Sequence, residues 1–144
     1  MRTKKHECTL ALIKPDAVEA AHIGGIIGMI EASGLRIAAM KTTRLTLAQA
    51  KAFYEVHRKR PFYRSLTRFM SSGPIVAMVL EGERAIARWR ELMGPTDSHE
   101  APETTVRGRF GTDKERNAVH GSDARETAEK EIRFFFPVAE LIRR

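Results

Sequence analysis

Short apolar runs and polar breaks divide this chain into predicted strands and helices. Uninterrupted apolar runs at residues 9–13 and 75–80 are typical of strands buried in a sheet, and residues 35–45 form a third, mixed strand candidate. The first run stops at Lys14, directly before a proline that cannot continue a buried strand. A shorter piece at residues 117–120 is the fourth predicted strand.

In the first half of the chain, apolar residues between these strands recur at helical spacing. Isoleucines predict a first helix that ends at Gly34, the residue type favoured at a C-cap. Thr46 has the side chain expected of an N-cap for a helix over residues 47–56. A second short helix opens at Pro61. The predicted inner faces are Ile23, Ile26, Ile27 and Ile30 for the first helix, and Phe62, Leu66, Phe69 and Met70 for the short one.

The second half of the chain predicts two more helices separated by a long loop. The helix after Gly82 has Ile86, Trp89 and Met93 on its inner stripe, and Arg90 falls on the same stripe, which is unusual for a charged residue. Residues 94–116 show no period and are predicted to be a loop of the length that compact domains reserve for function. The inner positions of the last helix are Ala128, Ile132 and Phe135.

The order of these elements predicts the fold class. Strands and helices are mixed without strict alternation, which favours an α+β fold: a ferredoxin-like α/β sandwich with a four-stranded antiparallel sheet and helices on one face. A doubly wound sheet is the second choice. The length of 144 residues suits one domain over residues 1–144, and no linker or internal repeat is visible.

Charge and cysteine content narrow the partners and the compartment. Lysine and arginine number 25 against 18 acidic residues, so the net charge of +7 favours an anionic partner: nucleotides, nucleic acid or an acidic surface, with plain solvation as a further alternative. The apolar runs are too short for a membrane span of about 20 residues. Cys8 is the single cysteine and can form no internal disulfide, which predicts a cytoplasmic protein.

Any phosphate site in this chain has to be built from side chains, because no glycine-rich phosphate-binding loop is present. The candidates are Lys14 at a strand end, Arg90 on a helix stripe, and Thr96 and Arg107 in the long loop.

Of the five histidines, His120 is the best candidate nucleophile. It follows residues 117–119 of the short fourth strand and precedes residues 121–123, which are predicted to cap the last helix at a point where backbone donors face an anion. Glu131 lies beside the inner stripe of that helix, where a carboxylate needs a partner. One ring nitrogen of His120 can supply that partner, which leaves the other nitrogen as a nucleophile. A structural histidine in a turn is the simpler alternative for His120 taken alone.

Five segments of the chain, residues 9–17, 60–62, 72–77, 92–96 and 116–123, resemble those of nucleoside diphosphate kinases. The resemblance extends over roughly residues 8 to 137, and its most specific part is the segment Asn117-x-x-His120-Gly-Ser-Asp123. It implies transfer of the γ-phosphate of a nucleoside triphosphate to a nucleoside diphosphate by a ping-pong mechanism through a phosphohistidine, with little base specificity.

The same resemblance implies roles for individual residues in the phosphoryl transfer. His120 would accept the phosphoryl group, Glu131 and Ser122 would orient its ring, and Tyr54 would steady the histidine neighbourhood. Lys14 would contact the transferring phosphate.

For the nucleotide, the resemblance implies a base stacked on Phe62 and sugar hydroxyls that contact Lys14 and Asn117. The β and γ phosphates would be held by Arg90, Thr96 and Arg107. Mg²⁺ would arrive on the nucleotide phosphates, without a protein metal site. The resemblance also implies a homo-oligomer, a tetramer or hexamer built from dimers. Asp97-Ser98 stands where Asn-Pro is common, which puts in doubt how the long loop supports subunit contacts.

Two other classes of protein agree less well with the sequence. An RNA-binding sheet needs aromatic residues on its central strands, and residues 9–13 and 75–80 contain none. A catalytically silent assembly protein is disfavoured because every residue that the chemistry requires is present. Neither nucleic-acid binding nor a membrane is therefore required.

Overall fold

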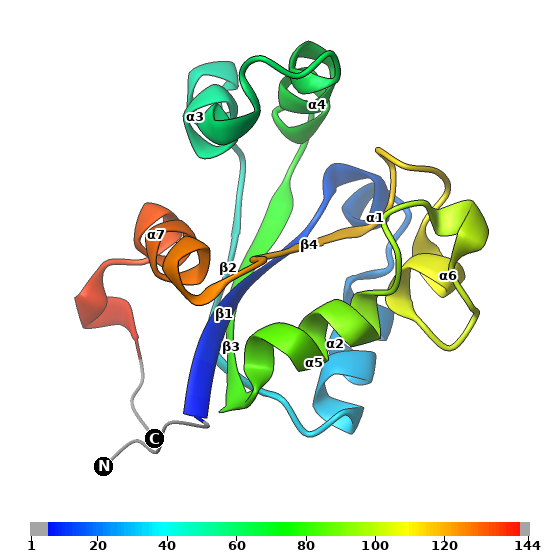
Figure 1. The fold of residues 1–144 in the computed structure, drawn as a ribbon, viewed down its shortest axis with the longest axis vertical. Coiled ribbons are helices and arrows are strands. Elements are labelled where there is room, and N and C mark those ends of the chain that lie inside the picture. Colours follow the sequence, from blue (N-terminus) through cyan, green and yellow to red (C-terminus); the bar gives the residue numbers. More distant parts are fainter. Residues whose placement is uncertain (1–5, 142–144) are drawn as a thin grey trace.

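The computed structural model describes residues 6–141, in which four β-strands form one sheet (Figure 1). The strands are β1 (His6–Ile13), β2 (Arg36–Thr43), β3 (Ile75–Glu83) and β4 (Val119–Gly121). Their order is β2-β3-β1-β4, and each neighbouring pair is antiparallel. This topology confirms the predicted four-stranded antiparallel sheet of ferredoxin-like type.

One face of the sheet packs against three helices. Leu10 and Leu12 of β1 point into a core shared with α3 (Leu47–Phe53), α4 (Tyr63–Met70) and α7 (Arg125–Phe135). Figure 1 shows α3, α4 and α7 on the same side of the central strands.

The opposite face of the sheet packs against a second set of helices. Ala11 and Ile13 of β1 lie in a core with α2 (Ile23–Ala32) and α5 (Ala85–Met93). The expectation of helices on one face was therefore wrong. Because residues 10–13 and 75–80 of the central strands are apolar at every position instead of at alternate ones, both faces have to be covered there.

The predicted helices are present, with small differences at their ends. Gly34 follows α2 with φ of +90°, as expected of its C-cap role. Thr46 accepts a hydrogen bond from the Gln49 amide in a complete capping box, but α3 ends at Phe53. A 3₁₀ turn over Glu55–His57 then replaces its predicted last turn.

Phe62 was predicted on the inner face of the short helix, and this was wrong. It precedes α4 at the N-cap position and is 46% exposed, whereas Leu66, Phe69 and Met70 are buried as expected.

No sequence pattern predicted two short helices and two 3₁₀ turns. One of these turns, Val138–Glu140, follows α7. Helix α1 (Pro15–Glu19) follows β1 directly, and the predicted loop over residues 94–116 contains a 3₁₀ turn (Ser98–Glu100) and α6 (Val106–Phe110). Five residues are too few to show a helical period. The Thr105 hydroxyl caps α6 by accepting a hydrogen bond from the Gly108 amide. Within residues 6–141 no helix is long and apolar enough to cross a membrane.

Candidate active site

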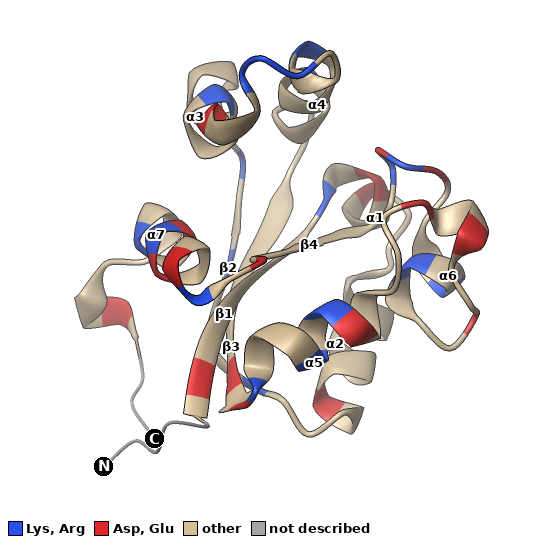
Figure 2. Ribbon diagram, viewed as in Figure 1, with Lys and Arg blue, Asp and Glu red and all other residues tan. Residues whose placement is uncertain are grey.

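A cleft of about 1070 Å³ opens between the α3–α4 hairpin, α5, α7 and the segment that leads into β4. It brings together residues from seven separate parts of the chain. Figure 2 shows basic residues on several of the surrounding elements, including the α3–α4 connection, α5 and α6. The predicted site residues that line the cleft are Lys14, Tyr54, Phe62, Arg90, Thr96, Arg107, Asn117, His120 and Glu131; Ser122 does not.

His120 lies within β4, with its ring at the cleft wall. Its Nε2 atom is 3.0 Å from Oε1 of Glu131, and the Ser122 hydroxyl donates to the same oxygen at 2.7 Å. An ionised carboxylate can only accept, so Nε2 carries the ring proton and Nδ1 keeps its lone pair. The rings of Phe53 and Tyr54 contact the imidazole edge to face, with centroids at 5.4 and 6.0 Å. The geometry thus decides which nitrogen is available, a choice that the sequence left open.

Residues 121–123 were predicted to cap the last helix, and this was wrong. Helix α7 begins at Arg125, and its N-cap residue, Ala124, makes no side-chain hydrogen bond. The Ser122 hydroxyl is engaged by Glu131 instead. Ser122, which was expected to cap the helix, therefore positions the Glu131 carboxylate, and Glu131 in turn contacts His120.

Lys14 is almost fully buried in the cleft wall, with 6% of its surface exposed. Burial, and to a smaller extent the charge of the nearby Arg107, lower its pKa from 10.5 to about 8. The Lys14 ammonium makes one long hydrogen bond, 3.4 Å, to the Glu115 carbonyl. The site thus holds a cation that is poorly compensated and well suited to an incoming anion.

Asp16 holds the turn before β4, a role that sequence reasoning missed. Its Oδ2 atom accepts a hydrogen bond from the Ala118 amide at 3.1 Å, while the Ala118 carbonyl accepts from the Lys14 amide at 2.8 Å. Ala118 has φ of +72°, and these two contacts hold that unfavourable backbone conformation. Burial raises the pKa of Asp16, against the lowering effect of the hydrogen bonds it accepts. Its place in Lys-Pro-Asp, at a strand end, was the available signal.

Arg107 is fixed by two backbone carbonyls from separate parts of the chain. Its guanidinium donates to the carbonyls of Gly94 and Val119, both at 2.9 Å. Burial lowers its pKa to about 10, and the charge of Arg90 contributes. Arg107 therefore joins the predicted loop to β4.

Arg90 was predicted to point inward with Trp89 and Met93, and this was wrong in part. The two apolar residues are buried, whereas Arg90 is exposed and lines the cleft. The neighbouring Trp89 has an unexpected role, because its indole nitrogen donates to the His120 carbonyl at 3.2 Å. Trp89 thereby fixes the strand that carries the histidine.

Asn117 is 2% exposed and connects two parts of the loop. Its amide nitrogen donates to the carbonyls of Thr96 and Lys114, at 3.0 and 2.9 Å. Its Oδ1 atom is buried and accepts no hydrogen bond from the described residues. Two hydrogen bonds thus fix the Asn117 side chain, and its Oδ1 atom has no donor among the described residues.

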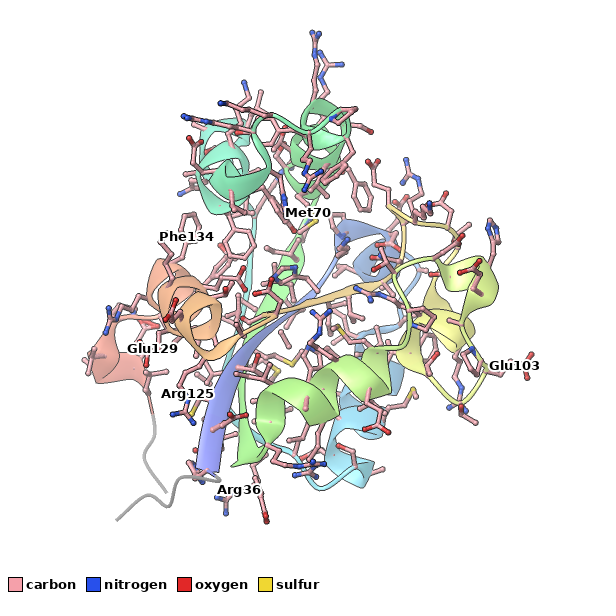
Figure 3. All side chains as sticks on the ribbon, in the orientation of Figure 1. Arg36, Met70, Glu103, Arg125, Glu129 and Phe134 are labelled. Atoms are coloured by element: carbon pink, nitrogen blue, oxygen red, sulfur yellow. The ribbon has the colours of Figure 1, made fainter. Side chains whose placement is uncertain are left out.

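Two aromatic residues differ sharply in exposure. Tyr54 is 5% exposed, and burial raises its pKa above the usual range, with Glu131 adding to the effect, so the phenol stays neutral. Phe62 is half exposed at the mouth of the cleft, with its ring centroid 5.4 Å from that of His57. His57 also lines the cleft, and it was not among the predicted site residues. Phe134 of α7, labelled in Figure 3, also lines the cleft, and its ring packs against that of Phe53 of α3.

The arrangement combines a neutral imidazole with one available nitrogen, cationic side chains around it and an aromatic ring at the entrance. These parts suit an enzyme that transfers a phosphoryl group by way of histidine, since phosphoryl transfer depends chiefly on positioning and charge.

The comparisons with known proteins agree with that class. The family model described as "Nucleoside diphosphate kinase" matches residues 7–141. "Nucleoside diphosphate kinase 1" of Protochlamydia amoebophila is 56% identical over 138 residues, which cover 96% of this chain and 98% of that protein. The enzyme of Oleidesulfovibrio alaskensis is also 56% identical, over 94% of this chain and 97% of its own.

Solved structures show the same likeness. The Aquifex aeolicus nucleoside diphosphate kinase superimposes with a TM-score of 0.94 at 49% identity, covering 95% of this chain and 99% of that one. The Halobacterium salinarum enzyme, solved in complex with CDP, gives a TM-score of 0.91 at 39% identity, over 95% and 91% of the two chains. The chain belongs to the nucleoside diphosphate kinase family. The expected activity, phosphoryl transfer from nucleoside triphosphates to nucleoside diphosphates, is confirmed.

Proposed function

We propose that His120 carries the phosphoryl group between the two nucleotides. Its Nδ1 atom attacks the γ-phosphorus of a nucleoside triphosphate, the bond to the β–γ bridging oxygen breaks, and the nucleoside diphosphate leaves. A terminal oxygen of a second diphosphate then attacks the phosphohistidine and regenerates the ring. The observation that carries this proposal is the Nε2–Glu131 contact of 3.0 Å at the wall of a cleft that Lys14, Arg90 and Arg107 also line.

In this mechanism Glu131 is a positioning residue. It keeps the proton on Nε2, and its charge stabilises the positive charge that develops on the ring as Nδ1 attacks. The Ser122 hydroxyl, 2.7 Å from the same carboxylate oxygen, keeps Glu131 in that orientation. Tyr54 limits the motion of the imidazole through its edge-to-face contact and stays neutral beside Glu131.

Four residues are proposed to bind the phosphates. Lys14, Arg90 and Arg107 offer positive charge to the β and γ phosphates, and Thr96 offers its hydroxyl. Support comes from their common position on the cleft and from the burial of Lys14 and Arg107, because a charge in a site shielded from water acts more strongly. Each such contact is worth about 3 kcal/mol in a transition state.

We propose that Mg²⁺ enters on the nucleotide. Among residues 6–141, the one group of three side chains able to hold a metal ion is formed by His6, Cys8 and Glu81, which do not line the cleft. Mg²⁺ commonly binds through substrate phosphates and water instead of an all-protein cage. It would neutralise charge on the β and γ phosphates.

For the nucleoside, we propose a stack of the base on Phe62 and hydroxyl contacts from Lys14 and Asn117. Phe62 is 46% exposed at the cleft mouth, and a π-face accepts any base, which supports low base specificity. The complex of the Halobacterium salinarum relative with CDP supports a nucleoside diphosphate as the occupant of the cleft.

Labelling with γ-phosphate-labelled ATP tests the assignment of His120. The protein should acquire an acid-labile, alkali-stable phosphate and pass it to GDP. His120→Ala should acquire none while it still binds nucleotide, since binding rests on other residues. His57→Ala is the matched control, a second histidine on the same cleft that should still be labelled. Label retained on His120→Ala would overturn the proposal.

We also propose that the chain, as a single domain, assembles into a dimer-based tetramer or hexamer. All the proposed site residues come from one chain, and β2 lies at a sheet edge with Met40 half exposed, which leaves an edge for subunit contact. Light scattering across a dilution series, run beside an activity assay, tests this. A fully active monomer at all concentrations would refute it.

A cytoplasmic location, supported by the single cysteine, is tested by cell fractionation.

A further inference from the structure

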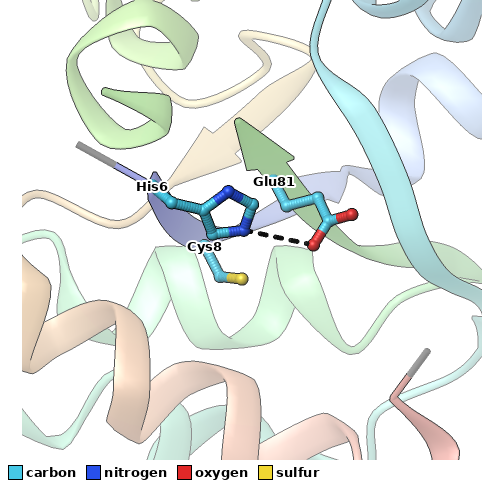
Figure 4. A group of neighbouring side chains, drawn as sticks. All are labelled: His6, Cys8 and Glu81. Carbon is cyan, nitrogen blue, oxygen red and sulfur yellow. Dashed lines mark ion pairs between the residues drawn. The ribbon is translucent and has the colours of Figure 1, made fainter. Parts of the chain in front are cut away.

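A second cluster of reactive side chains lies where β1 begins and β3 ends. His6 and Cys8 are two residues apart on β1 and therefore share one face of the sheet, and Glu81 of β3 is paired in register with Cys8. One potential ligand atom from each residue lies within 4.8 Å of the others (Figure 4). In Figure 3, Arg36, which contacts Glu81, lies at the opposite end of the sheet from Met70 of α4. The cluster is thus separate from the nucleotide cleft.

We propose that this cluster is a zinc site. Imidazole nitrogen, thiolate sulfur and carboxylate oxygen are the three ligand types that Zn²⁺ takes in proteins, at about 2.0–2.3 Å. Tetrahedral geometry at those bond lengths sets ligand atoms roughly 3.4–3.8 Å apart. The His6 Nε2 and Glu81 Oε2 atoms are already 3.5 Å apart. The sulfur of Cys8 lies within 4.8 Å of a ligand atom of each of the other two residues, so binding requires it to approach by about 1 Å at most.

The environment of Glu81 supports a cation at this position. Glu81 is 1% exposed, and a buried carboxylate is costly without compensating charge. Its Oε1 atom accepts no hydrogen bond from the described residues and lies 3.5 Å from the guanidinium of Arg36. Its Oε2 atom faces His6. Arg36 is half exposed and orients the carboxylate from the other side, as outer partners of metal ligands do.

The remaining coordination position is open to solvent. The side chain of His6 is 19% exposed and Cys8 is partly buried, so an ion can enter from the surface, with water as its fourth ligand. The bound ion would cross-link the first residues of β1 to the end of β3. Zinc should therefore raise the thermal stability of the protein, because an ion that binds only the folded state shifts the equilibrium toward it.

Isothermal titration calorimetry of the chelator-treated full chain with Zn²⁺ tests the proposal, because it measures the number of bound ions and their affinity. One ion should bind per chain, and Cys8→Ser or His6→Ala should weaken binding by more than about 10-fold, since loss of even an outer partner costs 10–100-fold. His99→Ala is the matched control: His99 is exposed and lies 3.4 Å from Asp97, so it tests whether any histidine beside a carboxylate binds the ion. This variant should bind zinc as the unmodified protein does.

Co²⁺ supplies a readout of the ligands themselves. A bound Co²⁺ should give a near-ultraviolet thiolate-to-metal absorption band that Cys8→Ser removes, with circular dichroism to show that the variant is folded. Glu81→Gln should weaken binding and keep the thiolate band at saturating Co²⁺. Zinc affinity that is unchanged in Cys8→Ser and His6→Ala, or equal losses in His99→Ala, would overturn the proposal.

Discussion

Replacement of Lys14 by methionine should stabilise the protein while it impairs the enzyme. Burial lowers the pKa of Lys14 from 10.5 to about 8, and each tenfold change in proton affinity corresponds to about 1.4 kcal/mol. The charged side chain therefore costs the folded state about 3 kcal/mol at neutral pH. Methionine has a similar length and no charge, so Lys14→Met should recover up to about 3 kcal/mol.

The pH dependence gives this prediction its sign. Between about pH 8 and pH 10.5 the unfolded chain keeps the Lys14 proton that the folded protein has lost, so stability of the unmodified protein rises with pH across that window. Below about pH 8 the ammonium is charged in both states and its full cost is present. The advantage of Lys14→Met should thus be greatest near pH 7 and shrink toward pH 10.

Urea unfolding of both proteins at about pH 7 and about pH 10, at one fixed protein concentration, measures this difference. Lys51→Met is the matched control, because Lys51 is exposed on α3 and its loss should change stability by less than about 0.5 kcal/mol. In the kinase assay Lys14→Met should lose at least about 100-fold in kcat/KM. A Lys14→Met protein that is less stable than the unmodified one at pH 7, or an advantage that does not change with pH, would refute the reasoning.

Three further experiments test separate parts of the structure. Glu131→Gln should lower kcat by about 10²–10⁴ with little change in KM, because its amide can favour the wrong tautomer of the histidine; an unchanged kcat would make Glu131 a surface acid. Phe62→Ala should raise KM for purine and pyrimidine diphosphates together by about tenfold, and a loss confined to purines would contradict open stacking. Gly108→Ala should destabilise the protein by about 3 kcal/mol in urea unfolding, because its Cβ would lie 1.9 Å from the Pro102 carbonyl oxygen, whereas Gly28→Ala in open space on α2 should stabilise it by about 0.5–1 kcal/mol; equal effects would refute the packing argument.

The sequence by itself determined the four strands, the longer helices and most of their inner faces. Apolar runs at residues 9–13 and 75–80 predicted the central strands, and helical spacing predicted Ala128, Ile132 and Phe135 as the buried positions of α7. These features are local, because the spacing of apolar residues along a strand or helix depends only on neighbouring residues. The same local logic placed Glu131 on the inner side of its helix, where its need for a partner led to His120.

Only the tertiary structure decided which atoms meet. The contact of Nε2 with the Glu131 carboxylate, and hence the availability of Nδ1 for the proposed phosphoryl transfer, depends on how α7 packs against the sheet. Arg90 was predicted to share the inner face of α5 with Trp89. That predicted face is wider than the part of the helix that is buried, so Arg90 lies outside the buried part and lines the cleft.

Contacts between distant strands were equally invisible in the sequence. Glu81 is 73 residues from Cys8, and only the antiparallel register of β1 with β3 sets the two side by side. Asp16 likewise accepts a hydrogen bond from the Ala118 amide, and no periodicity in the sequence predicts the turn that brings the two together. Periodicity assigns each side chain to a face of its own element, whereas packing and register, which depend on the whole chain, decide what that face touches.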